Sequence, residues 1–192
     1  VMCPTKNKIG MHFQKFDDFI YYPVIRSEIR DAVTSNQNYT LVYLNSFSDE
    51  ELLHFFHSKS FTGNLFVIYS KNAKYERTLN NCTIKPLNNE NFVQDISDCS
   101  AVITAAGFQT VSEALYLGKK LFVIPIKKQS EQISNARELA EMGVRSSDRL
   151  NEDEIKFWLD HERAVQIKFD DDLPNIINAI LHAPHEGRRK AA

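Results

Sequence analysis

Short, continuously apolar segments recur along this chain and alternate with stretches of helical character. The segments span residues 41–44, 65–69, 82–84, 101–104 and 121–124. Strands buried on both faces have this pattern, whereas strands with one solvated face alternate apolar and polar residues. Helices are expected near residues 48–56, 91–97, 110–117, 130–142, 152–161 and 173–181. The alternation predicts an α/β fold, a Rossmann-like open parallel sheet with helices on both faces.

Composition narrows the class of protein. Of the 192 residues, 43% are hydrophobic and 25% are charged, which is enough apolar material for a packed core. The net charge of −2 lacks the basic excess of nucleic-acid-binding proteins, so we expect no nucleic-acid partner. No apolar run is long enough for a transmembrane helix, and the N-terminus does not resemble a signal peptide. Cys3, Cys82 and Cys99 are widely spaced, which favours free thiols and a cytoplasmic location.

We expect three parts along the chain. Residues 1–38 show no clear period and are interpreted as a linker or interdomain segment that packs on the domain. Residues 39–183 contain the alternating strands and helices and are expected to form the Rossmann-like domain. Residues 184–192 are expected to be a frayed basic tail.

The loop after residues 101–104 is the most informative part of the sequence. In open parallel sheets, ligands bind beyond the carboxyl ends of the strands. Ala105, Ala106 and Gly107 follow this strand and precede a helix. Small residues let a ligand approach the backbone, and glycine tolerates a positive φ. The N-terminus of the helix presents N–H groups and a partial positive charge, so the loop is typical of a phosphate-binding turn.

A longer pattern begins in this loop. Residues 106–119 read AGFQTVSEALYLGK, residues 121–125 read LFVIP, and residues 129–136 read QSEQISNA. These blocks resemble the donor-binding signature of GT-B glycosyltransferases, and most of all the family 28 C-terminal domain. That family includes the lipid-linked N-acetylglucosamine transferase of peptidoglycan synthesis. The chain departs from it at Ala105 and Ala106, where many relatives carry histidine, and at Lys120, where many carry proline.

The resemblance implies that residues 39–183 are a nucleotide-sugar-binding domain, the C-terminal half of a GT-B fold. In that case Gly107, Gln109 and Thr110 would cradle the diphosphate. Glu113 would accept hydrogen bonds from the ribose hydroxyls of the nucleotide.

The resemblance also implies roles for residues outside this loop. Glu131 and Gln132 would bind hydroxyls of the transferred sugar, and Asn135 would support their loop or reach the sugar–phosphate. Phe92 would pack on the nucleobase. Ser46, which follows the first strand of the pattern, is a further candidate for phosphate or sugar binding.

The implied activity is that of a hexosyltransferase that takes a sugar from a nucleotide sugar, most simply a UDP-sugar. N–H donors and a helix dipole would stabilise the leaving nucleotide, so neither a metal ion nor a cofactor is expected. The resemblance places no catalytic residue in this chain, because the general base belongs to an N-terminal acceptor domain, in cis or as a separate subunit. The chain alone would then be inactive, and any peripheral association with a membrane would involve the missing part.

Simpler interpretations of these residues are also possible from the sequence. Thr110 and Glu113 have the spacing of a helix capping box, and Phe92 could be a core residue. Residues 131–132 could be ordinary polar residues of a first helical turn. Residues 170–172 could be an acidic metal motif, but a solvated run with a helix cap is the better interpretation. A nucleotide-sugar epimerase and a non-catalytic nucleotide-sugar-binding module remain alternative functions.

Overall fold

The computed structural model describes residues 9–182 of the chain. The chain divides into two compact units, and each is described by itself. One unit is Ile25–Lys168, and the other combines Val1–Val24 with Phe169–Ala192. Cys3 and the predicted tail at 184–192 lie outside the described residues, and the predicted division into three parts stays a prediction.

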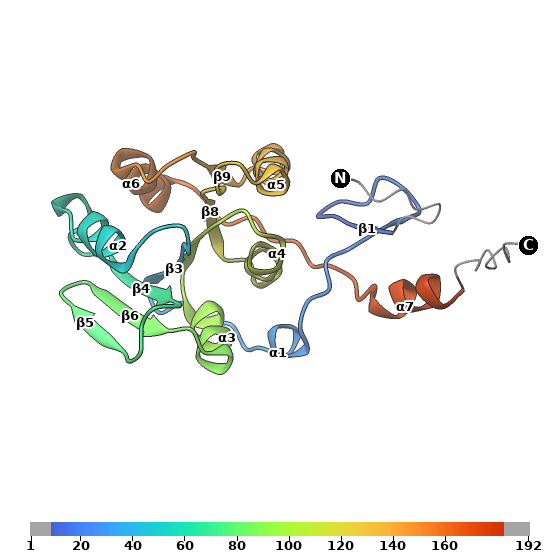
Figure 1. Ribbon diagram of the computed structural model, residues 1–192, viewed down its shortest axis with the longest axis horizontal. Helices are drawn as coiled ribbons and strands as arrows, with labels where there is room; N and C mark the ends of the chain where they lie inside the picture. The colour runs from blue at the N-terminus through green and yellow to red at the C-terminus, as the bar shows by residue number, and fades with distance from the viewer. Residues whose placement is uncertain (1–8, 183–192) are drawn as a thin grey trace, which may run out of the picture. The chain divides into compact units, whose positions relative to one another are not determined.

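A mostly parallel sheet forms the centre of the unit Ile25–Lys168 (Figure 1), in the strand order β5-β6-β4-β3-β7-β8-β9. The strands are β3 (Tyr39–Tyr43), β4 (Leu65–Ser70), β5 (Arg77–Leu79), β6 (Cys82–Pro86), β7 (Ala101–Thr104), β8 (Lys120–Val123) and β9 (Arg145–Ser146). Neighbouring strands are parallel except for β5, which runs antiparallel to β6 at one edge. The predicted Rossmann-like α/β fold is confirmed, with this antiparallel edge strand as a departure from the fully parallel sheet expected.

Helices cover both faces of this sheet (Figure 1). The helices of this unit are α1 (Ser27–Arg30), α2 (Asp49–Phe56), α3 (Asn89–Asp98), α4 (Phe108–Leu117), α5 (Ser130–Glu141) and α6 (Glu152–His161), with a 3-10 turn η1 (Lys59–Phe61). Helices α2 and α6 share one core with the sheet, through side chains such as Phe56 and Trp158. Helices α3 and α4 lie on the opposite face.

The side chains around the end of β3 pack against the helices on both faces of the sheet. Val42 and Leu44 are fully buried in the core beneath α2 and α6. Tyr43 points to the other face, where its ring meets the ring of Phe92 on α3 at a centroid distance of 5.5 Å. Because successive residues of a strand face opposite sides, a two-sided sheet needs the continuous apolar run that the sequence shows.

Helix α4 ends in a sharp turn that leads directly into β8. Gly118 adopts the left-handed conformation with φ +69°, which glycine reaches without the steric cost of a Cβ atom. The buried side chain of Lys119 donates hydrogen bonds to the carbonyls of Ser35, Ser97 and Cys99 at 2.8, 2.5 and 2.9 Å. Burial lowers the pKa of the Lys119 ammonium.

The second unit contains the short parallel strands β1 (Gly10–Met11) and β2 (Ile20–Tyr21) and the helix α7 (Leu173–Leu181). Asp172 precedes α7 and is buried, contrary to the solvated run expected there. Its carboxylate accepts hydrogen bonds from the Nζ of Lys15 at 2.7 Å and from the backbone N–H of Tyr22 at 2.8 Å. Within residues 9–182, no helix combines the length and apolar character needed to cross a bilayer.

Candidate nucleotide-sugar site

A cavity of about 340 Å³ opens at the carboxyl end of the sheet in the unit Ile25–Lys168. Three of its walls come from the ends of parallel strands of this sheet: the end of β3, the β6–α3 connection and the start of α4 after β7. A fourth wall comes from the segment before α1. The residues that line the cavity are Arg26, Tyr43, Leu87, Asn89, Phe92, Gln109, Thr110 and Glu113.

The structure brings four of the predicted site residues to this one cavity: Phe92, Gln109, Thr110 and Glu113. The other five are not among its lining residues. Ser46 is exposed after β3, and Gly107 immediately precedes α4. Glu131, Gln132 and Asn135 lie on α5, which follows β8. All five therefore follow strands whose carboxyl ends meet at the same edge of the sheet.

The start of α4 corrects two expectations. The helix begins at Phe108 with Gly107 as its N-cap, so Thr110 and Glu113 do not form a capping box. Gly107 has a φ of −74°, so no positive φ requires glycine there. No side chain caps this helix, and a Cβ atom built on Gly107 meets nothing within 4 Å. Open space therefore lies beside the backbone at a helix N-terminus, where anions bind.

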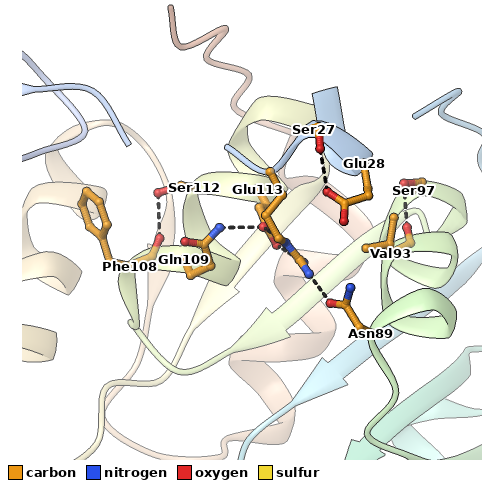
Figure 2. Close-up of polar contacts among 10 residues, drawn as sticks. Ser27, Glu28, Asn89, Val93, Ser97, Phe108, Gln109, Ser112 and Glu113 are labelled. Atoms are coloured by element: carbon orange, nitrogen blue, oxygen red, sulfur yellow. Dashed lines mark hydrogen bonds and ion pairs between the residues drawn. The ribbon is translucent and has the colours of Figure 1, made fainter. Parts of the chain in front are cut away.

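The carboxylate of Glu113 is buried beside this helix start, with its side chain 1% exposed. Its Oε1 accepts hydrogen bonds from Nε of Arg26 at 2.7 Å and from Nε2 of Gln109 at 2.6 Å. Its Oε2 accepts a hydrogen bond from Nη2 of Arg26 at 2.9 Å. Figure 2 shows Gln109 reaching Glu113 from the preceding turn of α4. The hydrogen bonds to Glu113 raise the pKa of the Arg26 guanidinium, and the fork geometry makes the ion pair bidentate.

Arg26 also connects α4 to α3. Its Nη1 donates a hydrogen bond to Oδ1 of Asn89, the first residue of α3 (Figure 2). Arg26 was not predicted from the sequence, because it lies 87 residues from Glu113 and no local motif links the two. It also missed Tyr43 and Leu87, whose apolar character indicates only a buried strand and a connection.

Phe92 lines the cavity but is mostly buried, with 6% of its surface exposed. Its ring packs edge-on against Tyr43 and against Tyr69, with centroid distances of 5.5 and 5.0 Å. The hydroxyl of Tyr69 donates to Asp95 at 2.7 Å, which fixes this aromatic group beneath α3. Phe92 is therefore a core residue with one edge at the cavity, and Tyr43 shares that wall.

Two amides of α5 fix the loops at this edge of the sheet. Nδ2 of Asn135 donates to the carbonyl of Ala106 at 3.0 Å, so α5 holds the loop before α4. Oε1 of Gln132 accepts from the backbone N–H of Ile126 at 3.0 Å. Glu131 is exposed in the first turn of α5. Among the described residues, no group of three or more His, Cys, Asp or Glu side chains could hold a metal ion.

Comparison with known families shows which family the chain belongs to. The sequence profile of glycosyl transferase family 1 matches residues 9–161, which is most of the chain. The chain belongs to glycosyl transferase family 1. No curated protein matches it significantly.

Solved glycosyltransferases share the fold of this family 1 chain. Spinosyn forosaminyltransferase SpnP is 16% identical with a TM-score of 0.51, and the match covers 84% of this chain and 44% of SpnP. The glycosyltransferase of kitacinnamycin is 16% identical with a TM-score of 0.50, covering 71% of this chain and 39% of that one. SnogD from Streptomyces nogalater is 17% identical with a TM-score of 0.49, covering 74% and 40%. The likenesses to SpnP and to the kitacinnamycin enzyme concern the fold alone. The chain spans about two fifths of the length of the three enzymes.

Proposed function

We propose that this chain is the donor-binding half of a glycosyltransferase that transfers a sugar from a nucleotide sugar. One observation carries the proposal. The buried carboxylate of Glu113 lies on the wall of a cavity beside a helix start that has open space and no side-chain cap. The cavity volume of about 340 Å³ falls in the range of small-molecule sites, roughly 300–1,000 Å³.

In this proposal the diphosphate lies against the backbone of Gly107, Gln109 and Thr110. The N-terminus of α4 contributes the N–H groups and the dipole that favour an anion. Cleavage of the sugar–phosphate bond develops negative charge on the leaving nucleotide, and these donors are already in place to stabilise it. The scheme therefore uses no metal ion and no cofactor.

The nucleoside would occupy the cavity itself. Glu113 accepts hydrogen bonds from the ribose hydroxyls, and the base lies against the wall formed by Tyr43, Leu87 and Phe92. We propose a uridine nucleotide, on the strength of the motif resemblance between residues 106–136 and the family 28 donor domain. The narrower likeness to the lipid-linked N-acetylglucosamine transferase of peptidoglycan synthesis has the same basis.

The transferred sugar would extend from the diphosphate toward α5. Glu131 and Gln132 offer directional acceptors and donors for sugar hydroxyls. Asn135 takes the supporting role, because its amide already holds the carbonyl of Ala106. Ser46 borders the same edge of the sheet and would contact the sugar or a phosphate.

We propose that the acceptor site and the general base belong to an N-terminal acceptor domain, joined in cis or acting as a separate subunit. The chain alone would then bind its nucleotide weakly and transfer no sugar. Any peripheral contact with a membrane would be made through that other domain. We expect a cytoplasmic location, in keeping with the free thiols of Cys82 and Cys99.

Titration with UDP, UDP-N-acetylglucosamine and GDP tests this function. We expect saturable binding of the two uridine nucleotides and weaker binding of GDP. Binding to none of the three would contradict the proposal. A sugar-transfer rate measured with the chain alone would overturn the assignment of the catalytic base to another domain.

A further inference from the structure

We infer that Arg26 is a positioning residue for the nucleotide, which holds the carboxylate of Glu113 in the orientation that accepts the ribose hydroxyls. The inference rests on the proposed function and adds to it a residue that lies outside the donor-binding motif. It concerns ribose specificity, because the Arg26–Glu113 pair lies on the wall of the cavity where the nucleoside would bind.

The carboxylate of Glu113 is buried in the protein. The side chain of Glu113 is 1% exposed, and a buried carboxylate is stable only where it is paired and hydrogen-bonded. Arg26 contributes two of the three hydrogen bonds that the described residues make to this carboxylate, and Gln109 contributes the third. Most of the hydrogen bonding to the Glu113 carboxylate therefore comes from Arg26.

The carboxylate of Glu113 has more acceptor positions than the protein fills. Each oxygen of a carboxylate accepts about two hydrogen bonds. Oε1 of Glu113 receives two, from Arg26 and Gln109, whereas Oε2 receives one, from Arg26. The guanidinium occupies one acceptor position on each oxygen, and Gln109 fills the second position of Oε1, which leaves Oε2 with capacity for a ligand hydroxyl.

The guanidinium of Arg26 is anchored to two helices. Nη1 of Arg26 donates to Asn89, so the planar group is held from α3 as well as from α4. Its side chain is 30% exposed, which leaves one edge open to the cavity. A lysine would offer a point charge without the fork, and could not fix both carboxylate oxygens at once.

The test compares UDP with 2′,3′-dideoxy-UDP, which lacks both ribose hydroxyls, by NMR titration of the chain. A hydrogen bond to a charged group contributes enough that we expect the wild type to prefer UDP by about tenfold. In Arg26→Gln we expect UDP to bind about tenfold more weakly and the dideoxy nucleotide to change by less than about threefold, so that the preference disappears. The matched control is Arg30→Gln, which removes the arginine at the end of α1, a residue that does not line the cavity.

The outcomes separate this inference from the proposed function. If Arg26→Gln does not fold, Arg26→Lys decides, because it keeps a charge beside Glu113 and lacks the fork; it should also lose the preference. A folded variant that still prefers UDP by about tenfold would overturn the inference alone. A wild type that binds both nucleotides equally would overturn it too, while leaving nucleotide binding intact. A wild type that binds neither would contradict the proposed function itself.

Discussion

The side-chain amide of Asn135 donates a hydrogen bond of 3.0 Å to the carbonyl of Ala106, and both groups are buried. This contact joins α5 to the loop that precedes α4. Ala106 directly precedes Gly107, so the position of the helix start depends on an amide that lies 29 residues further along the chain. The first and last blocks of the sequence motif, residues 106–119 and 129–136, are therefore joined by a hydrogen bond.

The replacement Asn135→Ala should destabilise the unit and weaken nucleotide binding. It leaves the buried carbonyl of Ala106 without its partner, at a cost of about 1–3 kcal/mol in the free energy of unfolding. Denaturant unfolding measures this cost, and titration with UDP measures the loss of affinity. The matched control is Ser134→Ala, at an exposed neighbouring position. Equal stability and UDP affinity in Asn135→Ala and the control would contradict the role of this contact.

A variant of Glu131 distinguishes binding of the sugar from binding of the nucleotide. The variant Glu131→Gln should bind UDP within about twofold of the wild type, but bind UDP-N-acetylglucosamine about tenfold more weakly, because only the sugar is proposed to touch this carboxylate. Calorimetric titration with both ligands gives the ratio. Glu141→Gln, at the exposed end of α5, is the control. A parallel loss for both ligands, or no loss for either, would remove Glu131 from the sugar site.

Two glycines at opposite ends of α4 should respond differently to alanine. Gly118→Ala places a Cβ atom at φ +69° and 2.9 Å from Gln166, so we expect a loss of about 1–2 kcal/mol in unfolding free energy. Gly107 has φ −74° and open space at its Cβ position. The unfolding free energy of Gly107→Ala should therefore stay within about 0.5 kcal/mol of the wild type. Thermal or denaturant unfolding of both variants checks the contrast. Equal destabilisation by the two changes would contradict the positive φ of Gly118 and the open space beside Gly107.

Asp98 should contribute to the loss of stability in acid. Its carboxylate accepts hydrogen bonds from Ser35 at 2.6 Å and Gln94 at 2.7 Å, and these lower its pKa below the usual 3.8. The folded state then binds fewer protons than the unfolded state at low pH. The stabilisation is complete above pH 3.8 and is lost as the pH falls through the lower, folded-state pKa.

The stability difference between the wild type and Asp98→Asn should therefore shrink as the pH falls. Denaturant unfolding between about pH 6 and about pH 2 measures it. Asp153→Asn, at an exposed position on α6, serves as the control. A difference that stays constant over this range would show that the Asp98 hydrogen bonds do not depend on its charge.

Local patterns predicted much of the fold. Apolar runs matched β3, β4, β6, β7 and β8, and the capping box at Ser48 and Glu51 is present at the start of α2. The edge strand β5 was missed because all three of its residues are exposed, so no apolar run indicates it. The predicted start of helix α4 was two residues late, because its N-cap is a glycine, which has no side chain to indicate a helix start.

Sequence patterns likewise predicted only part of the candidate site. Gln109, Thr110 and Glu113 lie on one helix, so their spacing alone brings them together. The pairing of Arg26 with Glu113 depends on how α1, α3 and α4 pack, and no short-range pattern encodes that. The contribution of Tyr43 was hidden for a different reason: a tyrosine at the end of a buried strand has the same appearance whether it faces the core or a cavity.

In the proposed function, the backbone at the start of α4 cradles the diphosphate of a nucleotide. The most direct measurement is an amide-resolved NMR titration of the chain with UDP, with uridine as the reference ligand. We expect saturable shifts concentrated at residues 107–110, present with UDP and nearly absent with uridine, and strongly reduced in Gly107→Ala, whose added methyl group occupies the open space. Saturable shifts that avoid these residues, or that uridine reproduces in full, would contradict the account.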